Sequence, residues 1–256
     1  MSDKNNNIKT LESGDIFFFY RPKVEIKSPK SESDIQRLYL VLHPEKKSLY
    51  RLSTVGQKEL PAPEKSGHQR YWGYVMKVAD KPEDIRNELG PEEYQTKTRG
   101  ERHVGAARPA GEGVYRIVNH DGHTHLIYAL ELPEKTGSVQ HELNIEEQAS
   151  FVITIKNPEK GSPPYAGLPK RQKTEYPQEL QIHFRDRRFT EADPPAYLNY
   201  EGAEFVLIAS SEDIKEDLGI EVKTEEETIC SADVFNELKI DRSRRPKKPL
   251  FTGEWQ

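Results

Sequence analysis

Three of the eight histidines lie close together in the sequence, His120, His123 and His125, on either side of the dipeptide Asp121-Gly122. An Asp-Gly dipeptide between two alternating strands is typical of a tight hairpin, because both residues tolerate the positive φ angles of the turn. Two histidines two residues apart, with a third across the hairpin, can bind zinc or another divalent ion. A metal-bound water would then make the protein a metal-dependent hydrolase. Without a fourth ligand nearby, the sequence favours the alternative, a polar hairpin tip in contact with water.

The alternation along this hairpin divides its side chains between two faces. The face with the histidines carries Val114, Arg116, Val118, His120, His123, His125, Ile127 and Ala129. The opposite face carries Tyr115, Ile117, Asn119, Thr124, Leu126, Tyr128 and Leu130. Because the second face has more large apolar groups, we expect it to face the core and the histidines to face outward or into a cleft.

Arginines form two groups that could bind an anion. The first group is Arg99, Arg102 and Arg108, and the second is Arg185, Arg187 and Arg188. Guanidinium groups bind carboxylates and phosphates with two parallel hydrogen bonds, so two groups that face one cleft would suit an anionic ligand. The alternative is ion pairing with the nearby acids Glu101, Glu112, Asp186 and Glu201. Ion pairing needs no ligand and is the favoured explanation.

Other chemistry has weaker signals. Aromatic residues at 71, 72 and 74 follow Arg70 and could stack on nucleic-acid bases, but a net charge of -5 opposes attraction to a polyanion. The sequence contains no phosphate-binding glycine loop, no dinucleotide-binding fingerprint and no G-x-S-x-G element. Cys230 lies among acidic residues, which disfavours its thiolate and a nucleophilic role. No residue is therefore assigned a catalytic role.

The composition sets the class of protein. Hydrophobic residues make up 34% of the 256 residues, and 18 prolines with 16 glycines predict many turns and long loops. A lone cysteine excludes an internal disulfide and is typical of a reducing compartment. No apolar run approaches the roughly 20 residues of a membrane helix, and the polar start M-S-D-K-N-N-N is unlike a signal peptide. We therefore expect a cytoplasmic protein without a membrane partner.

The pattern of strands and turns predicts an α+β fold dominated by antiparallel strands. Outside the hairpin, strands are expected at residues 16–20, 37–42, 48–55, 70–78, 151–155, 200–208 and 220–222. In the run I-F-F-F-Y both faces are apolar, which predicts a strand buried on both sides. Short helices are expected to begin near Pro82, Pro177, Ser211 and Ser231.

Five short matches, in the same order at offsets of roughly 80 to 90 residues, predict a tandem duplication. They pair Tyr39 with Tyr128, Tyr71–Val75 with Phe151–Ile153, Glu88-Leu89 with Glu179-Leu180, Arg99–His103 with Arg185–Phe189, and Glu112-Gly113 with Glu201-Gly202. The predicted division is a disordered tail at 1–11, β-rich repeats at 12–110 and 111–209, and a C-terminal extension at 210–256. This extension contains short helices and a basic arm.

The absence of catalytic motifs and the recurrence of arginines favour a non-catalytic binding or assembly protein. Its expected partner is another protein or an anionic ligand, recognised through a cleft between the two halves, and it needs no cofactor. One alternative is the metal-dependent hydrolase, with zinc or another divalent metal at His120, His123 and His125. The other alternative is a nucleic-acid-binding protein.

Overall fold

A computed structural model describes residues 8–62, 69–98, 100–163, 166–211, 222, 224, 231–243 and 246–255. The body of the helix predicted near Ser211 and most of the strand predicted at 220–222 lie outside these residues, as does Cys230. No helix among the described residues is long and apolar enough to cross a membrane.

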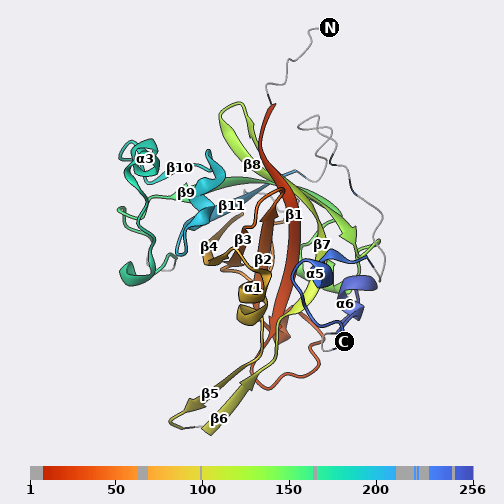
Figure 1. Cartoon of the computed structure of the whole chain (residues 1–256). Helices are drawn as coiled ribbons and strands as arrows, with labels where there is room; N and C mark the ends of the chain where they lie inside the picture. Colours follow the sequence, from red (N-terminus) through yellow and green to blue (C-terminus); the bar gives the residue numbers. More distant parts are fainter. Residues whose placement is uncertain are drawn as a thin grey trace.

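Eight antiparallel strands form a closed barrel (Figure 1). Around the barrel the order is β11-β4-β3-β2-β1-β7-β8-β9, and β9 closes it by pairing with β11. The strands are β1 (Ile8–Pro22), β2 (Ile35–Pro44), β3 (Tyr50–Val55), β4 (Arg70–Ala79), β7 (Arg108–His120), β8 (His123–Leu132), β9 (Gln148–Lys156) and β11 (Glu204–Ser211). A short strand, β10 (Phe189–Glu191), pairs with the end of β9. The prediction of a β-dominated antiparallel fold is confirmed.

Alternate side chains of the strands fill the barrel, so its interior is a packed core. From the central hairpin, Tyr115, Ile117, Leu126 and Tyr128 point inward and are nearly or completely buried. These residues belong to the face that the sequence assigns to the core, and this assignment is confirmed.

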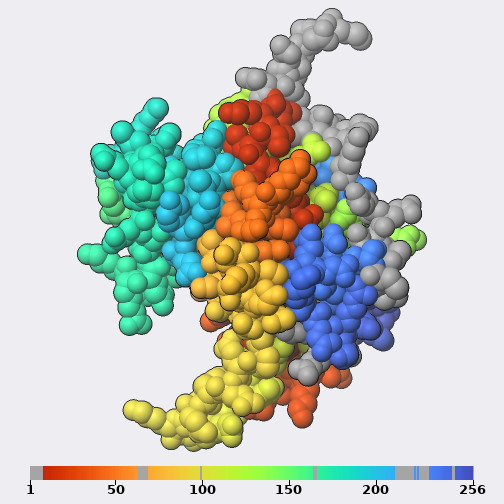
Figure 2. Space-filling model, viewed as in Figure 1, coloured from red at the N-terminus to blue at the C-terminus, as the bar shows by residue number. Residues whose placement is uncertain are grey.

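A second apolar cluster covers the outside of the barrel over β1, β2 and β3. Phe17 and Phe19 point outward from β1 and are completely buried, as the run of apolar residues predicts. They lie in one cluster with residues of α1 (Pro82–Glu88), α5 (Asp233–Asn236) and α6 (Lys248–Phe251). Figure 2 shows the C-terminal segment, in blue, packed beside these earlier parts of the chain.

Buried polar side chains hold this C-terminal segment against the barrel. Glu112 of β7 accepts hydrogen bonds from the backbone N–H groups of Asp233 at 3.1 Å and Val234 at 2.8 Å. Because the first N–H groups of a helix have no partner inside it, the Glu112 carboxylate caps α5 from the barrel. Gln140, in α2 (Ser138–Leu143), donates to the carbonyl of Pro249 at 2.9 Å.

The remaining short elements surround the barrel. They are β5 (Glu92–Thr96), β6 (Gly100–Val104), α3 (Gln178–Gln181) and the 3-10 turns η1 (Glu32–Asp34), η2 (Lys170–Gln172), η3 (Ile182–Phe184) and η4 (Pro195–Asn199). The hairpin of β5 and β6 projects away from the barrel (Figure 1). Helices begin near Pro82, Pro177 and Ser231, as predicted.

Some elements differ from the sequence expectations for a physical reason. Residues 8–11, expected in the loose tail, form the start of β1 because they pair with the end of β7. The strand expected from residue 200 begins at Glu204, after a turn. Strands β5, β6 and β10 are mostly polar or very short, so they lack the apolar alternation that marks a strand in a sequence.

The two predicted repeats contribute to one barrel. Residues 12–110 supply β1 to β4, and residues 111–209 supply most of β7, then β8, β9, β10 and β11. The predicted boundary near residue 110 falls inside β7, which runs continuously from Arg108 to His120. The duplication itself stays a prediction.

Candidate binding pocket

The outer face of β4 carries a row of cationic and aromatic side chains. Tyr71 and Val75 pack against the barrel core, so the alternating residues Arg70, Trp72 and Tyr74 point outward. Strand β11 pairs with β4 on one side and with β9 on the other, so the outer faces of the three strands are continuous.

A pocket of about 840 Å³ lies on this surface. Its floor comes from β4, β9 and β11, and its walls come from residues 56–57, residues 163 and 166–168, and the start of β10. The lining includes Gln57, Arg70, Trp72, Tyr74, Thr154, Leu168, Arg188, Phe189, Glu204 and Val206. The volume is within the roughly 300–1,000 Å³ of pockets that bind small molecules.

Two aromatic side chains in the pocket come from distant parts of the sequence. The ring centroids of Trp72 and Phe189 are 5.8 Å apart, with an angle of 60° between the ring planes. Both side chains are partly exposed and line the pocket. Their rings offer an apolar surface on which a planar part of a ligand can pack.

Two guanidinium groups, those of Arg70 and Arg188, also line the pocket. Both residues are exposed, and neither guanidinium has a hydrogen bond or an ion pair with another described residue. Two acids proposed as partners for the second arginine group are bound elsewhere. Asp186 pairs with Lys160, and Glu201 lies 3.0 Å from Lys77. Ion pairing with these acids therefore does not explain Arg188.

A buried acid lines the pocket, and two lysines lie close to this acid or interact with it electrostatically. Glu204, 3% exposed, accepts the N–H of Leu168 with one oxygen. Its other oxygen has no hydrogen bond and lies 3.6 Å from Nζ of Lys173. Burial, with the charges of Lys173 and Arg188, lowers the pKa of Lys156 to about 8 against the opposing effect of Glu204. The pocket therefore carries an excess of positive charge around one carboxylate.

The structure separates the two arginine groups of the sequence. Arg102 lies on the projecting β5–β6 hairpin, 3.7 Å from Glu25, and Arg108 donates to the carbonyl of Lys27. Arg99 lies outside the described residues. The second group lies between η3 and β10, on another side of the barrel (Figure 1). The described members of the two groups do not meet in a common cleft.

Within the second group the three arginines differ. Arg185 has a positive φ of 46° and ends η3, and Arg187 donates from Nε to the carbonyl of Phe184 at 3.4 Å. Of the five predicted arginines that the structure describes, only Arg188 lines the pocket.

The hairpin histidines lie at the turn between β7 and β8, where His120 pairs with His123. The ring centroids of His120 and His125 are 6.2 Å apart, and His123 lies 3.8 Å from Glu191. His125 is 6% exposed because β9 packs beside it, with Ser150 3.2 Å from its Nδ1. His125 lies on the same face as Val118 and Ile127, opposite to the core residues Leu126 and Tyr128, and is buried on that face. Metal binding by the three stays a prediction.

The protonation of His125 follows from its burial. Burial, with the charges of His120 and His123, lowers its pKa to about 4, so the ring is neutral at physiological pH. The neutral ring of His125 keeps a lone pair on one nitrogen, which is the form of histidine that can bind a metal ion.

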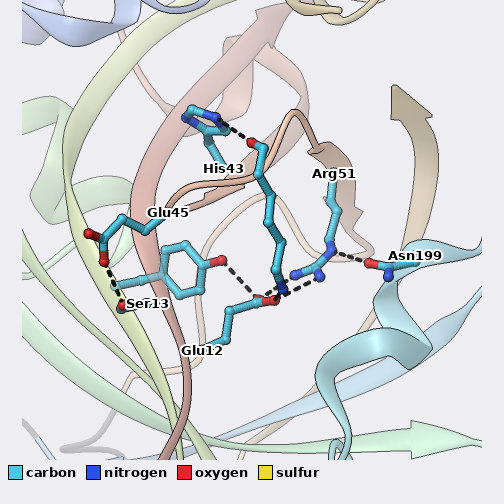
Figure 3. A network of polar contacts seen from close by, with 8 residues as sticks. Glu12, Ser13, His43, Glu45, Arg51 and Asn199 are labelled. Carbon is cyan, nitrogen blue, oxygen red and sulfur yellow. Dashed lines mark hydrogen bonds and ion pairs between the residues drawn. The ribbon is translucent and has the colours of Figure 1, made fainter. Parts of the chain in front are cut away.

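A buried ion pair lies inside one end of the barrel (Figure 3). Arg51, 1% exposed, donates to both carboxylate oxygens of Glu12, at 2.5 and 2.9 Å, and to Asn199 at 2.8 Å. Tyr115 donates to Glu12 at 2.9 Å, and Lys47 lies 3.3 Å from it. Burial raises the pKa of Glu12, but the hydrogen bonds and charge of Arg51, helped by Tyr115 and Lys47, lower it overall.

No protein-family model, no curated protein and no solved structure matches the chain.

Sequence reasoning found part of this pocket and missed the rest. The alternation after Arg70 and the cluster at Arg188 both point to residues that line it. Gln57, Phe189 and Glu204 have no local signal, because only the closure of the barrel brings them to one surface.

Proposed function

We propose that this protein is a non-catalytic binding protein whose outer pocket holds an anionic ligand with a planar apolar part. The observation that carries the proposal is the position of two guanidinium groups, Arg70 and Arg188, beside Trp72 and Phe189 in one pocket. The guanidiniums have no acidic partner among the described residues, so they are available to a ligand.

Each part of the pocket has a chemical counterpart in such a ligand. Arginine binds phosphate or carboxylate with paired hydrogen bonds, and a charge-assisted hydrogen bond contributes about 1.5–3 kcal/mol. The aromatic rings favour a planar group through stacking and burial of apolar surface.

A small molecule fits these observations better than a polymer. A base and phosphate of single-stranded nucleic acid have the same chemistry, but a net charge of -5 disfavours a long polyanion. The hydrolase hypothesis needs three imidazoles to converge on one ion, and it is tested by metal analysis of a variant without the hairpin histidines.

The order of the strands supports the predicted duplication. In the barrel the first strands of the two predicted repeats, β1 and β7, pair with each other, and so do the last strands, β4 and β11. Two copies of one four-stranded unit related by a two-fold axis would produce this order, which supports a duplication. Of the sequence matches, Tyr39 with Tyr128 joins the second strands of the two units, β2 and β8. The match of Tyr71–Val75 with Phe151–Ile153 joins the fourth strand of one unit, β4, to the third strand of the other, β9. We place the protein in the cytoplasm because it has a lone cysteine.

Phenyl phosphate is a suitable probe, because it joins an aromatic ring to an anion and can be compared with phosphate and phenol separately. The chain has two tryptophans, and a Trp255→Phe background leaves Trp72 as the fluorescent reporter in the pocket. We expect saturable quenching by phenyl phosphate, with an affinity at least about tenfold above that of inorganic phosphate and about 100-fold or more above that of phenol.

The matched control removes the same type of charge elsewhere. Arg37 is exposed on β2 and does not line the pocket, so Arg37→Gln should bind phenyl phosphate like the parent protein. Arg70→Gln and Arg188→Gln should each weaken binding by about 10- to 100-fold. Equal affinity in the pocket variants and the control would contradict the proposal.

A further inference from the structure

A histidine and two carboxylates from three segments meet on the outside of the barrel. Asp15 and His43 are directly paired across β1 and β2, and Glu237 follows α5. The Nδ1 atom of His43 lies 2.9 Å from Oε2 of Glu237 and 3.5 Å from Oδ2 of Asp15. The side chains are 17%, 28% and 27% exposed for His43, Asp15 and Glu237, so the cluster is partly shielded from water.

The hydrogen bond of Nε2 in His43 decides whether Nδ1 carries a proton or a lone pair. Nε2 lies 3.2 Å from the carbonyl oxygen of Lys47 (Figure 3), and because a carbonyl only accepts, Nε2 carries the proton of this hydrogen bond. In the neutral ring, Nδ1 then presents a lone pair toward two carboxylates that also only accept. The arrangement therefore needs a positive species between the three atoms, either a proton or a metal cation.

The distances suit a metal ion. Zinc binds histidine nitrogen and carboxylate oxygen at about 2.0–2.2 Å, so two ligand atoms at tetrahedral angles lie about 3.3–3.6 Å apart. The separation of Nδ1 from Asp15 is 3.5 Å, within this range, the separation from Glu237 is 2.9 Å, below it, and all three ligand atoms lie within 4.8 Å of one another. Small side-chain movements would bring all three onto one ion. Among the residues that the structure describes, no other three His, Cys, Asp or Glu side chains bring their ligand atoms this close together.

The surroundings hold the histidine in the orientation that a ligand requires. Tyr50 stacks on the ring, with centroids 4.3 Å apart and 12° between the planes. The Lys47 carbonyl fixes the proton on Nε2, and metal-binding histidines commonly donate their second N–H to a backbone carbonyl in this way. Gly14 lets the strands approach closely beside the site, since a Cβ there would lie 2.0 Å from the His43 carbonyl oxygen.

We propose that Asp15, His43 and Glu237 form a binding site for one divalent transition-metal ion, zinc being the best match to the donor set. One imidazole and two carboxylates leave at least one coordination position for water. Because Glu237 is 194 residues from His43 in sequence, the ion would fasten the C-terminal segment to the β1–β2 hairpin. It would lie on the same outer side as the contact between Glu112 and α5.

The proposal is tested by metal binding to the full chain after removal of bound metal with a chelator. Calorimetric titration with zinc should show about one equivalent bound, and cobalt should give a visible absorption band typical of a low-coordinate nitrogen and oxygen site. Glu237→Gln keeps the shape of the side chain but removes its charge, and we expect at least about tenfold weaker zinc binding. His43→Gln should abolish the cobalt band.

Two controls separate this site from others. Glu45→Gln removes a carboxylate two residues after His43, in the turn between β2 and β3. Glu45 contacts Ser13 and Lys46 instead of His43, so this variant should leave zinc affinity unchanged. A variant with His120, His123 and His125 all changed to Gln should bind zinc with the same affinity as the parent protein. Circular dichroism in chelator confirms that each variant is folded. Absence of zinc binding by the parent protein, or binding that Glu237→Gln leaves unchanged, would overturn the proposal.

Discussion

The buried ion pair inside the barrel leads to a quantitative prediction about stability. Arg51→Met removes the guanidinium and leaves an apolar side chain of similar length. Glu12 then loses two hydrogen bonds, at 2.5 and 2.9 Å, but keeps the Tyr115 hydroxyl and the charge of Lys47. Breaking a buried pair costs about 3–5 kcal/mol, because it leaves a charge without its partner. Since Lys47 partly neutralises Glu12, we expect the lower end, about 3 kcal/mol.

The assay is urea denaturation of the parent protein and the variants at neutral pH. A loss of about 3 kcal/mol also corresponds to a fall of about 6–12 °C in melting temperature for a chain of this size. The matched variant Glu12→Leu/Arg51→Met removes both charges. It should be more stable than Arg51→Met alone, because no charge is then buried without its partner.

Two results would refute this reasoning. A loss below about 1 kcal/mol for Arg51→Met would mean that water reaches the pair and screens it. Equal or lower stability of the double variant than of Arg51→Met would mean that packing around the two stems, rather than charge, dominates the effect.

Two further predictions concern pH and the C-terminal segment. The pKa of Glu12 is lowered from its ordinary value of 4.5, so its stabilising contribution is present above that value and is lost as the pH falls through the lower folded-state value. The free energy of unfolding should therefore fall more steeply as the pH is lowered below 4.5 in the parent protein than in Glu12→Leu/Arg51→Met; parallel curves would contradict this. Glu112→Ala removes the acceptor for the N–H groups of Asp233 and Val234, so amide exchange at 233–238 should accelerate while β8 stays protected. Unchanged exchange at 233–238 would show that the apolar cluster alone holds α5.

Local pattern is enough to predict the strands of the barrel and the orientation of their side chains, because alternation is set by neighbouring residues. It identifies the inward face of the central hairpin and the two buried faces of the I-F-F-F-Y run. It does not predict how exposed an outward side chain is. His125 lies on the outer face of the hairpin but is 6% exposed, with Ser150 of β9 3.2 Å from its Nδ1.

In the candidate sites, too, single residues can be predicted from local sequence, but their meeting in space cannot. Arg188 and the row after Arg70 are visible in the sequence, but their meeting depends on the pairing of β4 with β11 and of β11 with β9. His43 and Glu237 are separated by 194 residues, and no local spacing connects them. Arg102 resembles Arg188 in its sequence context, yet it lies on a projecting hairpin with a different neighbour, Glu25.

The central claim is that Arg70 and Arg188 act on the anionic group of a ligand that Trp72 and Phe189 help to hold. The most direct measurement is a thermodynamic cycle that combines loss of both arginines with loss of the phosphate from the ligand. In the parent protein, replacing phenyl phosphate by phenol should weaken binding by about 100-fold or more. In Arg70→Gln/Arg188→Gln the same replacement should weaken it less than about threefold, because the groups that recognise the phosphate are gone. The same large loss in both proteins would show that the phosphate is recognised elsewhere and would contradict the account.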